Sequence, residues 1–364
     1  MIKTIEEILQ QSDFSREDVI QLLQSDVVGR NKIYTKAAEI KTQYVGNKVF
    51  YRGLVEFSNK CVKDCYYCGI RASNTNTIRY DISDEAILYA VKYAYDNKYA
   101  SVVFQSGERE DKAFVKRITN LLRKSKEITN NEIGITISLG EQTKEVYKEW
   151  FDAGAHRYLL RIESSTKELF EKIHPNNTRH NFERRMQALR DLQEIGYQTG
   201  TGVMIGLPFQ TIEHLADDLL FFREFSIDMV GMGPYVEHSE TPLFQYKHLL
   251  LPQVERFNLA LKMIAILRIM MKDINIAAAT ALQAIDKAGR EKALKVGANI
   301  IMPNITPTEN RSNYLLYENK PCIDESADDC SSCLEARISI AGDKVAYNEW
   351  GDSWHYNKRM KNEE

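Results

Sequence analysis

The sequence predicts an α/β fold: a complete (β/α)8 TIM-type barrel with an N-terminal helical extension and a C-terminal segment that carries cysteines. Short apolar runs rich in β-branched residues alternate with helical patterns along the chain, which is typical of parallel βαβ units. Eight such units over about 250 residues have the size of a complete barrel. The 364 residues contain no Pro-, Gly- or Ser-rich linker that would divide them.

The elements of this barrel are expected in alternation. Strands are predicted at Val49–Ser58, Ser101–Ser106, Gly134–Leu139, Arg157–Glu163, Thr199–Gly206, Met229–Gly233, Ile276–Ala281 and Asn299–Pro303. Helices are predicted at Asp84–Asp96, Lys112–Lys126, Lys144–Ala153, Phe182–Ile195, Ile212–Phe225, Val254–Met271 and Ile285–Val296.

The chain is expected to have three parts within one compact unit. Residues 1–48 are predicted to form two amphipathic helices that pack on the barrel and cover its bottom. The barrel itself is assigned to residues 49–310. Residues 311–364 are predicted to be a C-terminal segment that carries an accessory metal site and belongs to the same compact domain.

Composition disfavours nucleic acid or a membrane as partner. The chain has 48 Lys+Arg against 51 Asp+Glu, a net charge of −3, and no basic arm. Its most apolar stretch, Phe257 to Met271, is interrupted by Lys262 and Arg268, as in a helix of a soluble protein. Acidic residues near the N-terminus occupy the place where a secretory signal needs an apolar core. We therefore expect a cytoplasmic protein, in a compartment where structural disulfides are rare.

The six cysteines form two groups of three. The first group is Cys61, Cys65 and Cys68, and the second group is Cys322, Cys330 and Cys333. No cysteine lies between the two groups. Cysteines grouped in this way in a cytoplasmic chain indicate thiolate metal sites rather than a disulfide framework. Thiolates favour zinc and iron–sulfur clusters.

The first group has the spacing CxxxCxxC and no fourth ligand nearby. A closed zinc site or a standard four-iron cluster needs four protein ligands, so three thiolates on a four-iron cluster would leave one iron open. An open metal position is typical of a catalytic site. The alternatives are three cysteines without a metal, or a zinc site completed by a distant histidine, of which His156 is the nearest in sequence.

Polar residues follow the predicted strands where a barrel has its active site, at the carboxyl ends. Gln105 to Glu108 end the second strand, and residues 136–141 end the third. In the fourth, Arg157, Arg161 and Glu163 share one face by the two-residue period of a strand. Charges inside a barrel are costly unless they are paired or bound to a ligand. A structural cluster of ion pairs is therefore the alternative to ligand binding there.

The CxxxCxxC loop, with Tyr67 directly before Cys68, resembles the cluster loop of the radical S-adenosylmethionine (SAM) superfamily. The resemblance implies that these three cysteines hold a [4Fe–4S] cluster whose open iron binds the amino and carboxylate groups of SAM. One electron from the cluster then cleaves the sulfonium to methionine and a 5′-deoxyadenosyl radical.

A closer resemblance extends from about Val45 to Cys333. The strings YRGLVEFSNKCVKDCYYCGIRASNTNTIRY, VFQSGERE, TISLGE, RYLLRIES, TGTGVMIGLPFQT, MVGMGPYVEHSETPL and ANIIMPNITP resemble, in this order, the HydE family of [FeFe]-hydrogenase maturases. The spacing of the second cysteine group is similar to the accessory cluster site of some family members. That implies a second iron–sulfur cluster, [2Fe–2S] or [4Fe–4S], on Cys322, Cys330 and Cys333.

The resemblance also implies the roles of individual residues. The expected SAM contacts are Tyr67, Gln105, Gly107, Glu108, Ser138, Arg161, Glu163 and Arg185. Among them, Gly107 and Glu108 fall at the motif that contacts the methionine amino group, Glu163 would accept from the ribose hydroxyls, and Arg185 would pair with the carboxylate. The expected substrate contacts are Thr136, Arg157, Thr280, Met302, Tyr314 and Tyr317. Ala279 departs from the family pattern, in which a second threonine precedes Thr280.

The family's substrate is thought to be an iron–cysteine complex that carries carbon monoxide and cyanide. The implied partners are this small organometallic substrate, the maturases HydG and HydF, and an external one-electron donor. Two alternatives remain: a small-molecule mutase of the methylornithine-synthase type, and, in a different class, a two-cluster electron-transfer protein. A sulfur donor like biotin synthase is disfavoured because no cysteine lies between Gly69 and Pro321.

The second cysteine group lies in an acidic segment with Asp324, Glu325, Asp328 and Asp329. Such a segment is typical of a surface loop, so we expect this site to lie some distance from the barrel axis and to be accessory to the reaction.

Overall fold

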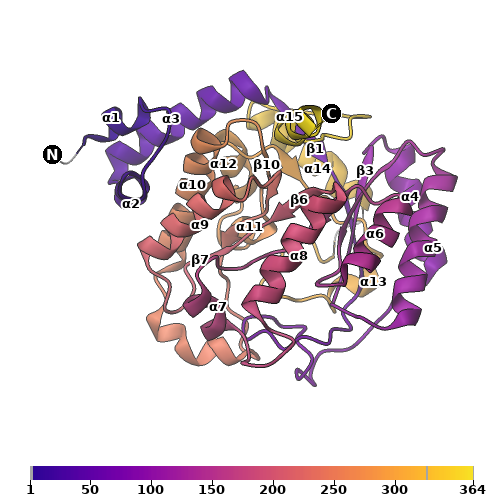
Figure 1. Ribbon diagram of the computed structural model, residues 1–364. Coiled ribbons are helices and arrows are strands. Elements are labelled where there is room, and N and C mark those ends of the chain that lie inside the picture. Colours follow the sequence, from indigo (N-terminus) through magenta and orange to yellow (C-terminus); the bar gives the residue numbers. More distant parts are fainter. Residues whose placement is uncertain (1–2, 325–326, 364) are drawn as a thin grey trace.

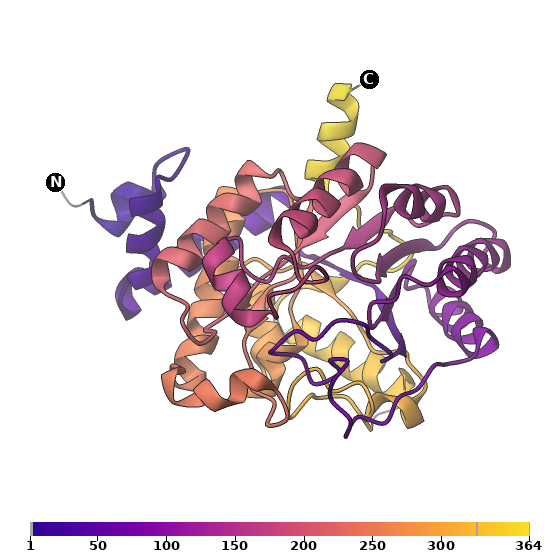
Figure 2. The same cartoon turned by 60° about the horizontal axis from the view of Figure 1, so that its bottom comes forward.

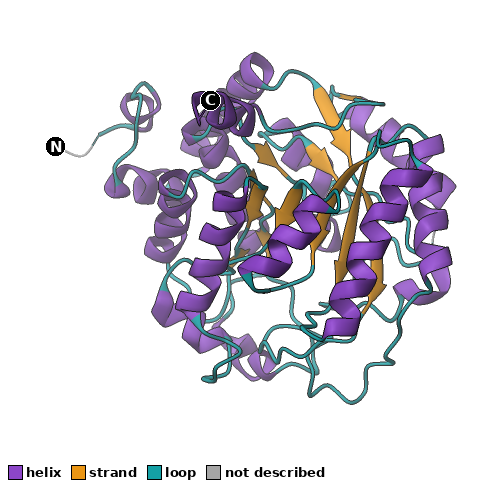
Figure 3. Cartoon of the chain, turned by 45° about the vertical axis from the view of Figure 1, so that its right-hand side comes forward, coloured by secondary structure: helices purple, strands orange, loops and turns teal. Residues whose placement is uncertain are grey.

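The computed structural model describes residues 3–324 and 327–363. It has strands at the centre and helices around them, with long loops gathered at one end of the strands (Figures 1 and 3). Each predicted strand region overlaps a strand of the structure, although over Ile276–Ala281 the overlap is Ile276 alone.

The strands form an α/β arrangement of parallel ladders. The largest sheet has the order β10-β8-β6-β5-β4-β3-β2, and a smaller one has the order β11-β1-β12. Parallel bridges of Leu54 to Asn304 and of Ala277 to Ile300 lie between these sheets. The strands are β1 (Lys48–Tyr51), β2 (Gly53–Ser58), β3 (Ser101–Ser106), β4 (Gly134–Ser138), β5 (Arg157–Leu159), β6 (Gln198–Thr201), β7 (Met204–Ile205), β8 (Met229–Val230), β9 (Gly233–Pro234), β10 (Asn275–Ile276), β11 (Ile300–Ile301) and β12 (Lys344–Val345).

Each predicted helix overlaps a helix of the structure. The outer helices are α4 (Asp84–Asp96), α5 (Lys112–Ile128), α6 (Lys144–Asp152), α7 (Lys167–Ile173), α8 (Phe182–Ile195), α9 (Ile212–Glu224), α10 (Gln253–Met270), α11 (Thr280–Ile285) and α12 (Gly289–Lys295). Two of these outer helices, α7 and α11, were not predicted. The helix predicted over Ile285–Val296 begins instead at Gly289, and Ile285 ends the separate helix α11, which starts within the strand predicted over Ile276–Ala281. The Asp286 carboxylate accepts from the Ala288 N–H at 2.8 Å, a local turn that competes with continuous helix.

Further elements follow in the second half of the chain. They are the 3-10 helix η1 (Pro242–Leu249) and the helices α13 (Thr308–Arg311), α14 (Ala327–Ile340) and α15 (Trp354–Glu363).

The N-terminal region has three helices rather than the two predicted: α1 (Ile5–Leu9), α2 (Arg16–Gln24) and α3 (Val27–Tyr44). Thr4 and Ser15 each form a capping box, and Asp26 caps α3, which explains the three starts. These helices pack on the outside of the barrel, α2 against α9 and α3 against α10 (Figure 1).

The C-terminal segment around Asp352 covers the amino ends of the strands, contrary to the expectation that the N-terminal helices cover the bottom of the barrel. Arg52 and Asn275 both donate to the Gly351 carbonyl, and the Ser353 N–H donates to Gln198. These partners lie near the starts of strands, so one short segment satisfies polar groups from several strands at once.

Helix α10 is buried on nearly every side, and so are the two cations that interrupt its apolar sequence. Arg268 donates to the carbonyls of Gly297 and Ile274 at 2.9 and 2.8 Å, and Lys262 donates to Leu23 and Ser25 at the end of α2. Carbonyl acceptors lower the cost of burying these charges. Within the described chain, no helix combines the length and apolarity that crossing a membrane would require.

Candidate active site

A cavity of about 350 Å³ lies at the carboxyl ends of the strands, and all three cysteines of the first group line it. Figure 2 turns this end toward the viewer and shows the purple loop after β2 beside the orange and yellow C-terminal part of the chain. The expected site residues that line the cavity are Cys61, Cys65, Tyr67, Cys68, Gln105, Gly107, Glu108, Ser138, Arg161, Glu163, Arg185, Thr280, Met302, Tyr314 and Tyr317.

The three cysteines are half-buried thiols on the loop between β2 and α4. The N–H groups of Lys63 and Glu108 donate to the Cys61 sulfur at 3.4 and 3.3 Å. Burial raises the pKa of Cys65 to about 12 and that of Cys68 well above its ordinary range. Without a metal these thiols would therefore remain protonated, whereas metal coordination deprotonates a thiol.

The loop after β3 approaches the cysteine loop too closely for a side chain at Gly107. A Cβ there would lie 2.4 Å from the Lys60 carbonyl oxygen. Gly140 has φ +81°, and its Cβ would lie 2.2 Å from Glu108 Oε2. Glycine at both positions lets Glu108 lie between the loops that follow β3 and β4.

Glu108 belongs to a buried network with Lys63, Glu141 and Arg185. Lys63 Nζ lies 3.2 Å from Glu108 Oε1 and 3.0 Å from Glu141 Oε2, and Arg185 Nε donates to Glu141 Oε1. Burial raises the pKa of Glu108. Burial acts against ionisation of Glu141 too, but Arg185 and Lys63 hold its pKa below the usual value. Glu108 Oε1 is buried and faces the Lys63 ammonium as an ion pair, but it accepts no hydrogen bond from described residues, so it can still accept one from a ligand.

Lys63 and Glu141 are missing from the sequence-based site. Lys63 lies inside the CxxxCxxC motif, and Glu141 ends the TISLGE string, so both were visible as neighbours of expected residues. Their mutual contact joins the loops after β2 and β4, and this pairing became evident only from the fold.

Arg161 and Glu163 form an ion pair on the cavity wall. Arg161 Nε and Nη2 donate to the two carboxylate oxygens of Glu163, each at 2.9 Å. Glu163 has φ +65°, an uncommon backbone conformation for a residue with a side chain. Its N–H donates to the Gly202 carbonyl at 2.9 Å, which fixes it in the gap between β5 and the next strand.

Arg157 and Thr136 do not line the cavity, which corrects their expected placement. Arg157 Nη1 donates to Ser101 at 2.8 Å, and its Nε and Nη2 donate to Asp352 at 2.9 and 2.6 Å. Thr136 lies opposite Arg157 in the β4–β5 register, and its side chain is also buried. Arg157 begins β5, so its side chain lies near the covered end of the barrel rather than near the cysteines.

The expected substrate end contains further charges that sequence reasoning missed. Lys320 Nζ lies 2.6 Å from Glu56 Oε1, and both line the cavity together with Arg290 and Asn304. Glu56 is inside the first predicted strand, where its charge was a visible signal because a buried strand seldom carries one. Ala279 lines the cavity where the family pattern predicted a threonine.

Cys322 lines this same cavity, so the expectation that the second cysteine group lies far from the barrel axis is wrong for this residue. Arg290 Nη2 donates to its sulfur at 3.8 Å. Cys333 is exposed on α14, and the side chain of Cys330 lies outside the described residues.

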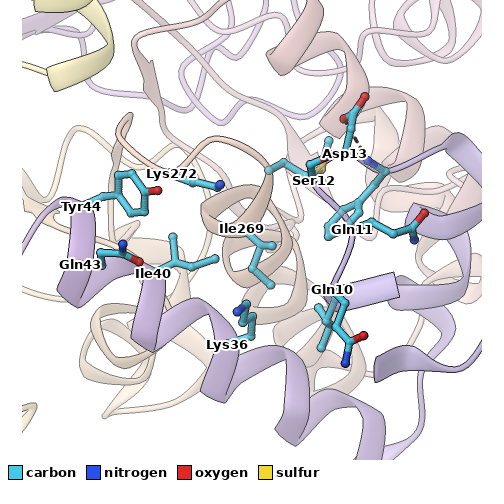
Figure 4. A pocket seen from close by; sticks show the side chains of 13 residues that line it. Gln10, Gln11, Ser12, Asp13, Lys36, Ile40, Gln43, Tyr44, Ile269 and Lys272 are labelled. Carbon is cyan, nitrogen blue, oxygen red and sulfur yellow. Dashed lines mark hydrogen bonds between the residues drawn. The ribbon is translucent and has the colours of Figure 1, made fainter. Parts of the chain in front are cut away.

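A different cavity, of about 420 Å³, lies between the α1–α2 turn, α3 and the end of α10 (Figure 4). Gln10, Lys36, Tyr44 and Lys272 are among the side chains around it, and no cysteine is. The barrel cavity is therefore the candidate active site.

Comparison with known proteins agrees with this geometry. The family model described as the radical SAM superfamily matches residues 55–222. The [FeFe] hydrogenase maturase subunit HydE of Thermotoga maritima is 41% identical over 350 residues, which are 96% of this chain and 97% of that protein. The 3-methylornithine synthase of Methanosarcina acetivorans is 28% identical over 321 residues, 85% of each chain.

Two solved structures share the fold. Methylornithine synthase has a TM-score of 0.77 at 23% identity, covering 94% of this chain and 97% of its own. HydG, described as a maturase of the [FeFe]-hydrogenase, has a TM-score of 0.76 at 19% identity, covering 94% and 75%.

Proposed function

Because this chain belongs to the HydE family of the radical SAM superfamily, we propose that it cleaves SAM reductively during assembly of the [FeFe]-hydrogenase diiron site. The observation that carries the proposal is the convergence of the three loop cysteines, Glu108 and Glu163 on one cavity. Membership of this family makes the chain an enzyme, so a two-cluster electron carrier is excluded as its function.

The residues present fit the cofactors that the superfamily implies. Three thiols supply three ligands of a four-iron cluster, and buried Glu108 Oε1 beside them, an ion-pair partner of Lys63, accepts no hydrogen bond from the described residues. When bound at Cys61, Cys65 and Cys68, a [4Fe–4S] cluster supplies the electron that splits the SAM sulfonium to methionine and the 5′-deoxyadenosyl radical.

The protein's own residues bind and orient SAM in this proposal. Glu108 accepts from the methionine ammonium, and Arg185 faces the methionine carboxylate while Glu141 holds its guanidinium. Glu163 accepts from the ribose hydroxyls, and the bidentate contact from Arg161 fixes the direction of its carboxylate. Tyr67, Gln105, Gly107 and Ser138 complete the contacts from neighbouring walls.

We extend the proposal to substrate and partners from the family. The substrate would be an iron–cysteine complex with carbon monoxide and cyanide, bound near Thr280, Met302, Tyr314 and Tyr317, with HydG before and HydF after this enzyme and an external one-electron donor. The second cysteine group would hold an accessory [2Fe–2S] or [4Fe–4S] cluster. Cytoplasmic location follows as part of the same proposal, since a reducing compartment keeps these thiols available.

We also propose that the strands close into a complete eight-stranded barrel. Backbone hydrogen bonds at the remaining joint support it: Ala278 N–H donates to Ile300 and Asn299 N–H to Ile276, both at 2.9 Å. On the other side of β11, Leu54 N–H donates to the Pro303 carbonyl at 2.7 Å. These bonds join β10 to β11, and the segment after β11 to β2.

The test is anaerobic reconstitution with iron and sulfide, reduction, and addition of SAM. Formation of 5′-deoxyadenosine supports the proposal, and its absence in a loaded protein contradicts it. A second assay adds HydG and HydF and measures activation of the apo-hydrogenase.

A mutase of the methylornithine-synthase type is the second candidate, since that structure covers 94% of this chain at TM-score 0.77. It predicts formation of 3-methylornithine and no hydrogenase activation. The two products separate the candidates.

A further inference from the structure

Four cationic side chains line the barrel cavity, and three of them have a carboxylate partner. Arg161 pairs with Glu163 at 2.9 Å, Lys320 with Glu56 at 2.6 Å, and Arg185 with Glu141. The fourth is Arg290, the second residue of α12. Among these four cations of the described chain, Arg290 is therefore the one whose charge no carboxylate neutralises.

Arg290 is only 4% exposed, yet no carboxylate among the described side chains pairs with it. Its Nε is buried and donates to none of the described residues. Its Nη2 makes a long contact of 3.8 Å with the sulfur of Cys322. A buried guanidinium with unused donors costs free energy unless an anion approaches it.

The backbone holds Arg290 firmly in this place. Gly289, directly before it, lies so close to Leu282 that a Cβ would be 2.3 Å from the Leu282 carbonyl oxygen. Its N–H also donates to the Asp286 carbonyl at 2.7 Å. The turn between α11 and α12 thus fixes the start of α12 and presents Arg290 to the cavity wall beside Cys322.

We propose that Arg290 is a substrate-binding residue that holds the carboxylate of the substrate's amino-acid portion, at the Cys322 side of the cavity. The Nε–H has no acceptor and the adjacent Nη2 makes only the long contact with sulfur, so this edge of the planar guanidinium matches a carboxylate, which can accept both donors in parallel. The inference rests on the proposed function, because it assumes that an amino-acid-bearing substrate enters this cavity. It names the chemical group of that substrate which this chain recognises.

A competing role for Arg290 is to balance the charge of metal-bound thiolates at Cys322. The two roles predict different losses on substitution. A substrate-binding Arg290 affects the affinity of carboxylate ligands, whereas a metal-balancing Arg290 affects the iron content at the second cysteine group.

The experiment measures binding of L-cysteine, and of cysteamine, which lacks the carboxylate, to the cluster-loaded enzyme with SAM by calorimetry. Arg290→Met removes the charge at similar length, and Arg290→Lys keeps the charge without the planar donors. Lys295→Met, on the exposed side of the same helix, is the control. Losing a hydrogen-bonded charge contact weakens affinity by roughly tenfold or more.

We expect Arg290→Met to raise the L-cysteine Kd about tenfold or more, Arg290→Lys to raise it less, and Lys295→Met to leave it unchanged. The cysteamine Kd should be the same in all four proteins. The inference is overturned if wild type does not bind L-cysteine, if Arg290→Met leaves its Kd unchanged, if cysteamine loses affinity equally, or if the variant loses only second-site iron. Formation of 5′-deoxyadenosine without substrate, measured in parallel on wild type and Lys295→Met, tests the proposed function separately.

Discussion

Arg157 and Arg161 lie four residues apart on the same inward face of one strand region, yet the fold gives them different surroundings. Arg157 is bound by Asp352, 195 residues away in sequence, and is fully enclosed at the covered end of the barrel. Arg161 is bound by Glu163, two residues away, and opens to the cavity. In this fold the carboxyl ends of the strands carry the active site, and residues at the amino ends contribute to the stability of the fold.

The two regions can be separated by substitution. Changes at the cavity end should abolish or weaken activity and leave the fold in place. Changes at the covered end should weaken the fold and leave the chemistry in place.

The largest expected effect is at the cysteine loop. Replacing Cys61, Cys65 or Cys68 by Ala leaves two thiolates for the cluster, and no other cysteine is near in sequence. We expect loss of the four-iron absorption and no detectable 5′-deoxyadenosine, with an unchanged melting temperature of the metal-free protein. Cys333→Ala, at an exposed position on α14, is the control. SAM cleavage at the wild-type rate in any of the three loop variants would show that the ligand assignment is wrong.

At the covered end, Asp352→Ala should destabilise the protein by about 3 kcal/mol, because it leaves the buried guanidinium of Arg157 without its carboxylate. The urea unfolding midpoint measures this. Glu349→Ala removes a neighbouring, half-exposed carboxylate and should change little. Folded variant protein should cleave SAM at the wild-type rate; a selective loss of cleavage would mean that the covered end takes part in the reaction.

This contribution also has a defined pH dependence. Although burial opposes ionisation, Arg157 holds the pKa of Asp352 far below its ordinary value. A depressed carboxylate pKa stabilises the folded state above the unfolded pKa of about 3.9 and loses that effect as pH falls. The stability difference between wild type and Asp352→Ala should therefore be constant from pH 7 to 5 and shrink below pH 4.

A smaller effect is expected for Glu163→Gln. Loss of a charged hydrogen bond to the ribose costs about 1.5–3 kcal/mol, so the Kd for SAM should rise roughly tenfold or more while iron content stays intact. Glu183→Gln, an exposed carboxylate paired with Lys167, is the control. An unchanged Kd for SAM together with a lower melting temperature would assign Glu163 to the Arg161 ion pair alone.

The smallest effect on SAM cleavage is expected when Cys322, Cys330 and Cys333 are all replaced by Ser. Iron per chain should fall, while 5′-deoxyadenosine formation and hydrogenase activation continue near the wild-type rate. Because Cys322 lines the cavity, the apparent KM of the substrate is the quantity to examine. Loss of activation with the first cluster still loaded would make the second site functional as an electron relay or a sulfur source.

How far the sequence predicted this site depended on the distance between interacting residues. The loop cysteines, Gly107, Glu108 and Glu163 are identified from motifs and Arg185 from the family resemblance, and all of them line one cavity. The sequence does not reveal the roles of Lys63, Glu141 and Arg290. Lys63 and Glu141 pair across two loops, and Arg290 reaches the cavity from a distant helix. Arg157 and Thr136 were assigned to the substrate on the basis of face and family, without knowledge of which strand end was covered.

The sequence by itself determined the alternation of strands and helices, because burial on one face of each element leaves a local period in the chain. It also determined the cysteine loop, whose three cysteines lie within eight residues. Only the tertiary structure decided that residues 350–353 cover the barrel and that Cys322 reaches its cavity. Those contacts join segments far apart in the chain, and no local pattern records them, since a side chain's partner depends on how all the intervening elements pack.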